Sequence, residues 1–176
     1  MYSYIETDRL RITYLEEYVV DDMFDVIDIL GDGETAWWFG IRPLGELDEA
    51  KDYIRYCGGE TMGVYEKASG KIAGVLQKQF LYDSDGTVQL GYALSPESRG
   101  KGYMTEAVKA ECAKLFEFPS VTRIRLMIHP ENEKSIGVAT RCGFKRVGPV
   151  TDGEEPGAAK GDPDDEYILK RDEHDQ

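Results

Sequence analysis

The chain has 176 residues, of which 41% are hydrophobic, so it is long enough for one domain with a proper core. Its formal net charge of −13 disfavours nucleic acid and anionic membranes as partners and favours a cationic one. No apolar run approaches the ~18 residues that cross a bilayer, and the first residues lack a signal-peptide pattern. The three widely spaced cysteines match neither a metal site nor a disulfide framework. Together these observations predict a cytoplasmic protein.

The first half of the chain shows strand and helix patterns in turn. Residues 10–15 alternate in part and predict a strand, and residues 19–30 carry apolar side chains at helical spacing. A Gly-rich connection follows, and then a second helix at residues 47–57. Residues 61–67 and 72–81 predict two strands joined by a tight turn, and a further turn leads to another strand.

The Gly-rich connection contains two adjacent tryptophans, Trp37 and Trp38. Adjacent side chains of a helix or a strand point in different directions. The plainer interpretation places one ring in the core and the other at the surface. The functional alternatives are a wall of a binding cleft and a dimer contact.

A glycine loop joins the strand at residues 90–94 to a helix. Gly100 and Gly102 let the backbone turn tightly. Residues 103–116 have helical spacing, so the free N–H groups of the first turn point at the loop and form a site for phosphate. The loop fits neither a P-loop nor the dinucleotide fingerprint, in which Thr105 stands where the third glycine is needed.

The motif Arg99-x-x-Gly102-x-Met104 resembles the acetyl-CoA pyrophosphate loop of the GNAT (GCN5-related N-acetyltransferase) superfamily. Met104 stands where that family has Gly or Ala. Downstream, a predicted strand at residues 123–128 leads to Asn132-x-x-Ser135, a helix to about residue 141, and Gly143-Phe144. This element resembles the second cofactor motif of the same superfamily, in the usual order and separation.

Residues 7–12 and 99–107 further resemble the branch that acetylates serine or alanine N-termini of ribosomal proteins. The whole resemblance covers about residues 6–150. It implies an α/β (α+β) GNAT fold with a mixed, mostly antiparallel sheet of about six to seven strands, splayed central strands and about four helices. We expect residues 1–176 to form a single acetyltransferase domain.

The resemblance also implies the cofactor contacts. The backbone groups of Tyr92 and Leu94 would bind pantetheine, and the Leu94 N–H would stabilise the oxyanion. Asn132 would hydrogen-bond the cofactor arm, with a helix N-cap as the alternative, and Ser135 would lie near the sulfur. The pyrophosphate would be held by the loop residues Arg99, Gly100, Lys101, Gly102, Tyr103, Met104 and Thr105.

The implied reaction is direct attack of a neutral amine on the thioester, which needs a base and an acid. Many family members place a Tyr seven residues after the Asn, where this chain has Ala139, so Ser135 is the remaining acid. The branch often has Glu at the position of Gln89, which cannot accept the proton. The base therefore stays open: an acid of the 152–166 stretch reached through water, or, by chemistry alone, His129 or His174.

Residues 151–166 hold seven acids and one lysine, and their Gly and Pro residues predict irregular structure. The stretch is either a solvated hairpin loop or a lid that attracts a basic acceptor. Residues 167–169 predict a last short strand, and residues 171–176 form a polar tail.

These patterns predict an acetyl-CoA-dependent N-acetyltransferase without a metal, acting on a protein or peptide N-terminus. The alternatives are a small-amine acetyltransferase (polyamine, amino acid or aminoglycoside) and a non-catalytic acyl-CoA-binding module, the latter motivated by Ala139 and Gln89. Trp37 and Trp38 beside an acidic rim suit a cationic amine. A homodimer is an expectation from the superfamily alone.

Overall fold

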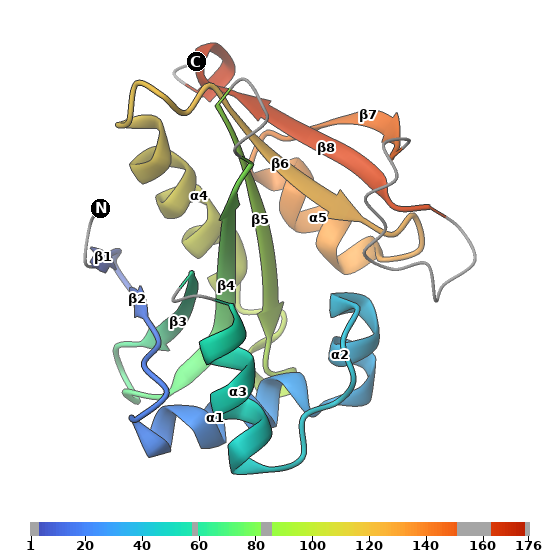
Figure 1. The fold of residues 1–176 in the computed structure, drawn as a ribbon. Coiled ribbons are helices and arrows are strands. Elements are labelled where there is room, and N and C mark those ends of the chain that lie inside the picture. The colour runs from blue at the N-terminus through green and yellow to red at the C-terminus, as the bar shows by residue number, and fades with distance from the viewer. Residues whose placement is uncertain (1–3, 58–59, 82–85, 151–162, 175–176) are drawn as a thin grey trace.

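The computed structural model describes residues 4–57, 60–81, 86–150 and 163–174 (Figure 1). No helix in these parts of the chain is long and apolar enough to cross a membrane. The elements in chain order are β1 (Tyr4–Glu6), β2 (Leu10–Tyr14), α1 (Val20–Leu30), α2 (Gly33–Phe39), α3 (Leu47–Tyr56), β3 (Thr61–Glu66), β4 (Ile72–Phe80), β5 (Thr87–Leu94), the 3-10 turn η1 (Pro96–Ser98), α4 (Tyr103–Phe116), β6 (Arg123–Ile128), α5 (Glu133–Arg141), β7 (Lys145–Pro149), β8 (Asp165–Lys170) and α6 (Arg171–His174).

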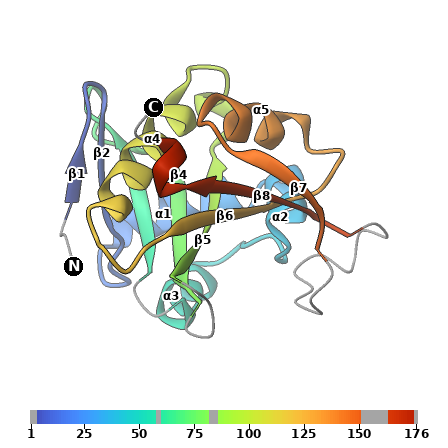
Figure 2. The same ribbon diagram turned by 90° about the horizontal axis from the view of Figure 1, so that it is seen from above.

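The strands form one sheet in the order β1-β2-β3-β4-β5-β6-β8-β7. All neighbouring strands are antiparallel except β5 and β6, which are parallel. The helices α1, α2 and α3 lie on one face, and α4 and α5 on the other (Figure 2). This architecture confirms the predicted fold class, although the sheet is 8-stranded and thus larger than expected.

The sheet opens at its centre. β5 and β6 pair only from Thr87 and Arg123 to Leu90 and Leu126. Beyond that point β5 continues along β4, whereas β6 continues along β8. The two strands diverge, as predicted for the splayed central strands, and we call the opening between residues 91–94 and 127–128 the fork.

Two hydrophobic cores hold the helices on the sheet. The first packs α4 and α5 on one face, and its α4 members follow the helical spacing seen in the sequence. The second packs α1 and α3 on the other face around Val75 and Ala93. Because both cores press on β4 and β5, these two central strands are fixed from both sides next to the fork.

Several elements differ from the sequence-based prediction. β1 was not predicted, β5 begins at Thr87, and the polar tail begins with the short helix α6. β8 begins at Asp165, two residues before the predicted strand, because the Asp165 carboxylate is buried and bound by Arg146 at 2.6 and 2.7 Å. The predicted acidic loop falls mostly on residues 151–162, which lie outside the described parts of the chain.

The helix α2 replaces the connection predicted around the two tryptophans. The Asp32 carboxylate caps it by accepting from the Thr35 N–H at 3.0 Å, and Gly40 ends it at φ 74°. An Asp followed three residues later by Thr is a usable N-cap signal, and a glycine in the left-handed region is a usual end. The helix is only 7 residues long, and its Trp and Gly residues are weak helix formers.

Candidate active site

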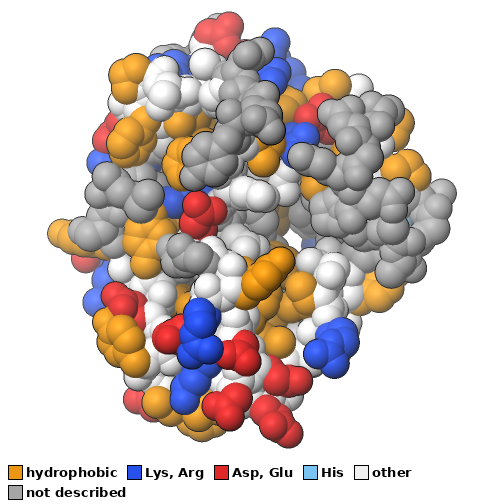
Figure 3. Space-filling view, in the orientation of Figure 1, with side chains coloured by type: hydrophobic (Ala, Val, Ile, Leu, Met, Phe, Trp, Pro, Cys, Tyr) orange, Lys and Arg blue, Asp and Glu red, His pale blue; other side chains and the backbone are white. Residues whose placement is uncertain are grey.

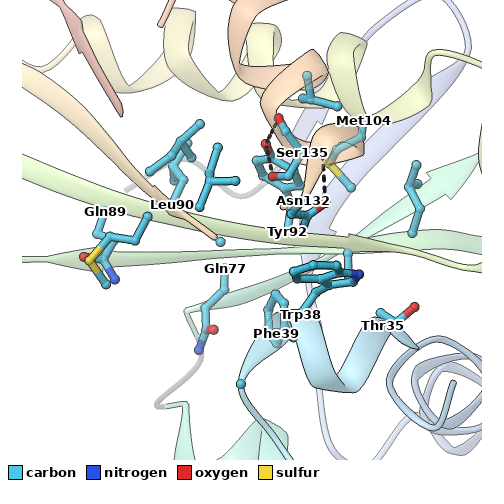
Figure 4. Close-up of a pocket in the computed structure, with 18 of the residues that line it drawn as sticks. Thr35, Trp38, Phe39, Gln77, Gln89, Leu90, Tyr92, Met104, Asn132 and Ser135 are labelled. Atoms are coloured by element: carbon cyan, nitrogen blue, oxygen red, sulfur yellow. Dashed lines mark hydrogen bonds between the residues drawn. The ribbon is translucent and has the colours of Figure 1, made fainter. Parts of the chain in front are cut away.

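A cleft of about 600 Å³ passes through the sheet at the fork (Figure 4). On the α4/α5 face its wall includes Met104 and Ser135, and on the α1–α3 face it includes Phe39 and Gln77. We call these two parts the cofactor arm and the acceptor arm. Residues predicted as cofactor contacts and as an acceptor wall thus border one continuous space.

Neighbouring residues of β5 point into different arms. Tyr92 hydrogen-bonds to Ser135 of α5, so its side chain lies in the cofactor arm. A Cβ placed on Gly91 would lie 3.7 Å from the Phe39 ring of α2, so position 91 faces the acceptor arm. The absent side chain of Gly91 therefore leaves room where the two arms meet.

The backbone groups of Tyr92 and Leu94 face the fork. The Ser95 N–H donates to the Ala73 carbonyl at 2.9 Å, and bonded pairs alternate along antiparallel strands such as β4 and β5. Residues 91 and 93 therefore bond to β4, whereas Tyr92 and Leu94 direct their N–H and C=O groups away from it. Because β6 has diverged there, these groups border the opening in which the resemblance places pantetheine.

The glycine loop has the geometry of a phosphate cradle. Gly100 and Gly102 adopt φ values of 77° and 80°, in the left-handed region that favours glycine. α4 begins at Tyr103, so the N–H groups of its first turn are free of intrahelical partners. The Met104 side chain is buried against Gly74 of β4, so its bulk points at the sheet and not at the loop.

The turn between β1 and β2 clamps this loop. The Arg9 guanidinium forms a 2.6 Å ion pair with Glu106 in the first turn of α4 and donates to the Lys101 carbonyl at 2.9 Å. The Thr7 hydroxyl donates to Glu106 at 2.5 Å, and the Arg9 guanidinium also lies over the Tyr103 ring. Two segments that separately resemble the ribosomal branch are thus in direct contact.

We expect Arg9→Ala to weaken acetyl-CoA binding about three- to tenfold, because the loop loses the donor that holds the Lys101 carbonyl. Titration calorimetry with acetyl-CoA measures this effect. Arg55→Ala is a matched control, because Arg55 forms exposed ion pairs with Glu17 and Asp52. Equal affinities of the Arg9 variant and the control would show that the clamp does not order the loop.

The Arg99 side chain connects the loop with α2. Its guanidinium donates to Asp32, Glu34 and the Thr35 hydroxyl at 2.8, 2.9 and 2.7 Å. Hydrogen bonds from Thr35, followed by Arg99, hold the pKa of the Asp32 carboxyl below its usual value, and Lys134 of α5 lowers that of Glu34. Since carboxylates occupy the Arg99 side chain, we expect the loop to hold phosphate mainly through backbone N–H groups.

Asn132 and Ser135 open α5 at the edge of the cofactor arm. The Asn132 Oδ1 accepts from the Ser135 N–H at 3.1 Å, so Asn132 is the N-cap of α5, and its Nδ2 remains as a donor. The Ser135 Oγ donates to the Tyr92 hydroxyl at 2.9 Å, and that hydroxyl donates to the Ser135 carbonyl at 3.2 Å. Burial raises the pKa of Tyr92, so the phenol keeps its proton at neutral pH.

Aromatic side chains of α2 form a wall of the acceptor arm. Trp38 and Phe39 line it, whereas Trp37 is 44% exposed and packs edge-on against Trp38 at 4.3 Å. His129 is buried beside both tryptophans, and its Nδ1 accepts from the Glu131 N–H at 3.2 Å. The neutral His129 ring therefore carries its proton on Nε2, which argues against His129 as the base.

Beside Gln89, which the family resemblance singled out, the acceptor arm holds polar residues that the sequence motifs did not mark. Gln77 and Gln79 of β4 and Gln89 of β5 line it, and Gln79 lies opposite Gln89 in the sheet. Glu60 also lines the cleft, and partial burial raises the pKa of its carboxyl. The alternation of Gln77 and Gln79 in a strand was the available signal, but it carries no family motif.

These residues fit acetyl-CoA on structural grounds: a glycine cradle at a helix start, strand amides that face a gap, and a cleft through the sheet. Among the described residues no group of three or more His, Cys, Asp or Glu is placed to hold a metal ion. The three cysteines carry free thiols, and burial raises the pKa of the Cys142 thiol to about 11.

Comparison with known proteins places this geometry in context. A family model described as an acetyltransferase (GNAT) domain matches residues 9–145. The uncharacterized N-acetyltransferase p20 of Bacillus licheniformis is 25% identical over 175 residues, which cover 94% of this chain and 95% of that protein.

Two solved structures share the fold at lower identity. The ribosomal-protein-S5-alanine acetyltransferase of Vibrio fischeri superposes with a TM-score of 0.74 at 18% identity, covering 97% of this chain and 98% of that one. The spermidine N-acetyltransferase of Vibrio cholerae, solved with CoA and spermine, gives 0.75 at 16% identity, covering 97% and 100%. At these identities the likeness shows a common fold and leaves the acceptor open.

Proposed function

The chain belongs to the GNAT acetyltransferase domain family, and from this premise we propose that it acetylates the primary amine of a protein or peptide N-terminus. The family identifies it as an acetyl-CoA-dependent N-acetyltransferase. This activity disfavours the alternative of a non-catalytic acyl-CoA-binding module. The observation that carries the assignment of the site is the cleft through the fork. Tyr92 and Leu94 of β5 border it, together with Arg99 and Met104 at the two ends of the glycine loop.

Acetyl-CoA supplies an activated acetyl group as a thioester. The α4 N-terminus and the loop backbone would hold its pyrophosphate, the Tyr92 and Leu94 backbone would orient the pantetheine, and the Leu94 N–H would stabilise the oxyanion. Ser135 would donate a proton to the departing sulfur. Glu60 is a base candidate, because it lines the acceptor arm with a raised pKa and can take a proton directly or through water.

The surface around the acceptor arm supports a cationic acceptor. Acidic side chains gather over α1 and α3, on the sheet face that carries the acceptor arm (Figure 3). Such a field raises the local concentration of cations. The acids of α1, α2 and α3 are Asp21, Asp22, Asp25, Asp28, Glu34, Asp48, Glu49 and Asp52, against the bases Lys51 and Arg55.

The resemblance of residues 7–12 and 99–107 to the ribosomal branch favours a peptide N-terminus over a small amine. The fold shared with the spermidine enzyme is also compatible with the alternative of a small-amine acceptor. Thiol release with acetyl-CoA and a panel of short peptides, polyamines, amino acids and aminoglycosides tests the proposal. We expect peptides with free N-termini to be the best acceptors, and a panel in which polyamines or aminoglycosides lead would overturn the peptide assignment.

We also propose that the protein is cytoplasmic and forms a homodimer. The free thiols of the described chain suit a reducing compartment, and the homodimer follows from the superfamily resemblance. Light scattering coupled to size-exclusion chromatography measures the mass in solution, and a mass near 19.8 kDa would contradict the dimer.

A further inference from the structure

We propose that Gln89, oriented by Arg125, is a specificity-determining residue that donates a hydrogen bond to a carbonyl oxygen beside the reacting amine. The inference rests on the proposed function and extends it, because it names the recognising atom as Gln89 Nε2. It also gives the acceptor class as α-amino carbonyl compounds, which excludes simple alkyl amines.

The orientation of the Gln89 carboxamide follows from its partner. Arg125 is 7% exposed, and its Nε and Nη2 both donate to the Gln89 Oε1, at 3.1 and 2.7 Å. A guanidinium is a donor only, so the carboxamide must turn its oxygen toward Arg125. Glu166 lies 3.7 Å from the Arg125 guanidinium and helps to fix it. The Gln89 Nε2 is therefore the free end, and within the described chain no group accepts from it.

The position of Gln89 places this donor at the inner end of the acceptor arm. Gln89 and Arg125 are in register, and the next pair, Leu90 and Leu126, is the last before the strands diverge. Gln89 shares a sheet face with Gly91, which looks toward Phe39. Its half-buried side chain lines the cleft, so an acceptor that reaches the fork from this face passes the carboxamide.

The chemistry of a fixed donor selects the acceptor. A peptide N-terminus carries a carbonyl oxygen on the carbon next to its amine-bearing carbon, and this oxygen can accept from Gln89 Nε2. A polyamine offers methylene groups and a second ammonium in the same place. A second ammonium would leave the Gln89 donor unsatisfied and would approach the positive charge of Arg125.

Two matched amines test this inference: L-alaninamide and 2-aminopropane, which differ by the carboxamide. We expect Gln89→Leu to lower kcat/KM for L-alaninamide about tenfold, the loss of one good hydrogen bond, and to change kcat/KM for 2-aminopropane less than twofold. Comparing variant with wild type for each amine cancels their different intrinsic basicities. Arg125→Lys keeps the charge but loses the contact of two nitrogens with the Gln89 Oε1. It should also lower kcat/KM for L-alaninamide relative to that for 2-aminopropane.

If Gln89 had a purely structural role, Gln89→Leu would lower kcat/KM for both amines alike, together with the melting temperature and the acetyl-CoA affinity. That result would overturn the inference. Unchanged values for both amines would overturn it as well. Wild-type protein that binds acetyl-CoA but acetylates neither probe nor any peptide would contradict the proposed function separately. In that case calorimetry of L-alaninamide with the CoA-bound protein decides: weaker binding to Gln89→Leu supports the donor, and equal binding refutes it.

Discussion

Gly102→Glu is expected to abolish acetyl-CoA binding up to ~1 mM, a concentration that corresponds to only ~4 kcal/mol of binding free energy. Gly102 is the residue before α4 and adopts φ 80°. A glutamate there would put a side chain and a negative charge where the N–H groups of the first helical turn would hold phosphate. The chain should still fold, because a Cβ at Gly102 would meet only the flexible Arg9 guanidinium, at 3.5 Å.

Gly70→Glu is the matched control for backbone strain and added charge. Gly70 adopts φ 73° in the turn between β3 and β4, and a Cβ placed on it would have no neighbour within 4 Å. Both variants should lose ~1 kcal/mol of stability, because a non-glycine residue is strained in the left-handed region. Gly70→Glu should nevertheless keep its acetyl-CoA affinity. Calorimetry with both variants separates the two effects. Unchanged affinity of the Gly102 variant would mean that the phosphates bind elsewhere.

The cofactor half of the site could be predicted from the sequence because its signals are local. Gly100 and Gly102 stand directly before a helix, and Asn132 caps the helix that carries Ser135. Each of these contacts lies within a few residues of chain. The predicted start of α4 at Tyr103 is accordingly where the structure has it. The fork beside β5 has no local signal and was expected only from the resemblance to the superfamily.

The long-range contacts around the site could not be predicted, because they join distant segments of the chain. Arg9 and Glu106 are 97 positions apart, and Gln89 and Arg125 are 36 apart. Such pairs depend on which strands become neighbours, and only the sheet topology fixes that. The Arg99 side chain illustrates the same limit: its motif position suggests phosphate, but α2 brings Asp32 within 2.8 Å.

The second large effect is expected at Ser135. Ser135→Ala should lower kcat about a hundredfold, at the lower end of the usual range for a general acid, because a thiolate is already a fair leaving group. The Ser135 Oγ and the Tyr92 hydroxyl lie 2.9 Å apart. When Ser135 turns its proton to the sulfur, the Tyr92 hydroxyl, which donates to the Ser135 carbonyl in the structure, can rotate and donate to the Ser135 Oγ instead. The raised pKa keeps the phenol protonated before this step, and water returns a proton to it afterwards.

Tyr92→Phe tests this relay separately. It leaves the ring in the cofactor arm, so the KM for acetyl-CoA should stay within about threefold while kcat falls about tenfold. Thr140→Ala is a matched control on α5, because the Thr140 hydroxyl donates to the Ile136 carbonyl on the exposed side of that helix. Steady-state kinetics of the three variants, with acetyl-CoA affinity measured by calorimetry, decide the matter. A Ser135 variant that keeps kcat, or loses only acetyl-CoA affinity, would show that Ser135 positions the cofactor and gives no proton to the sulfur.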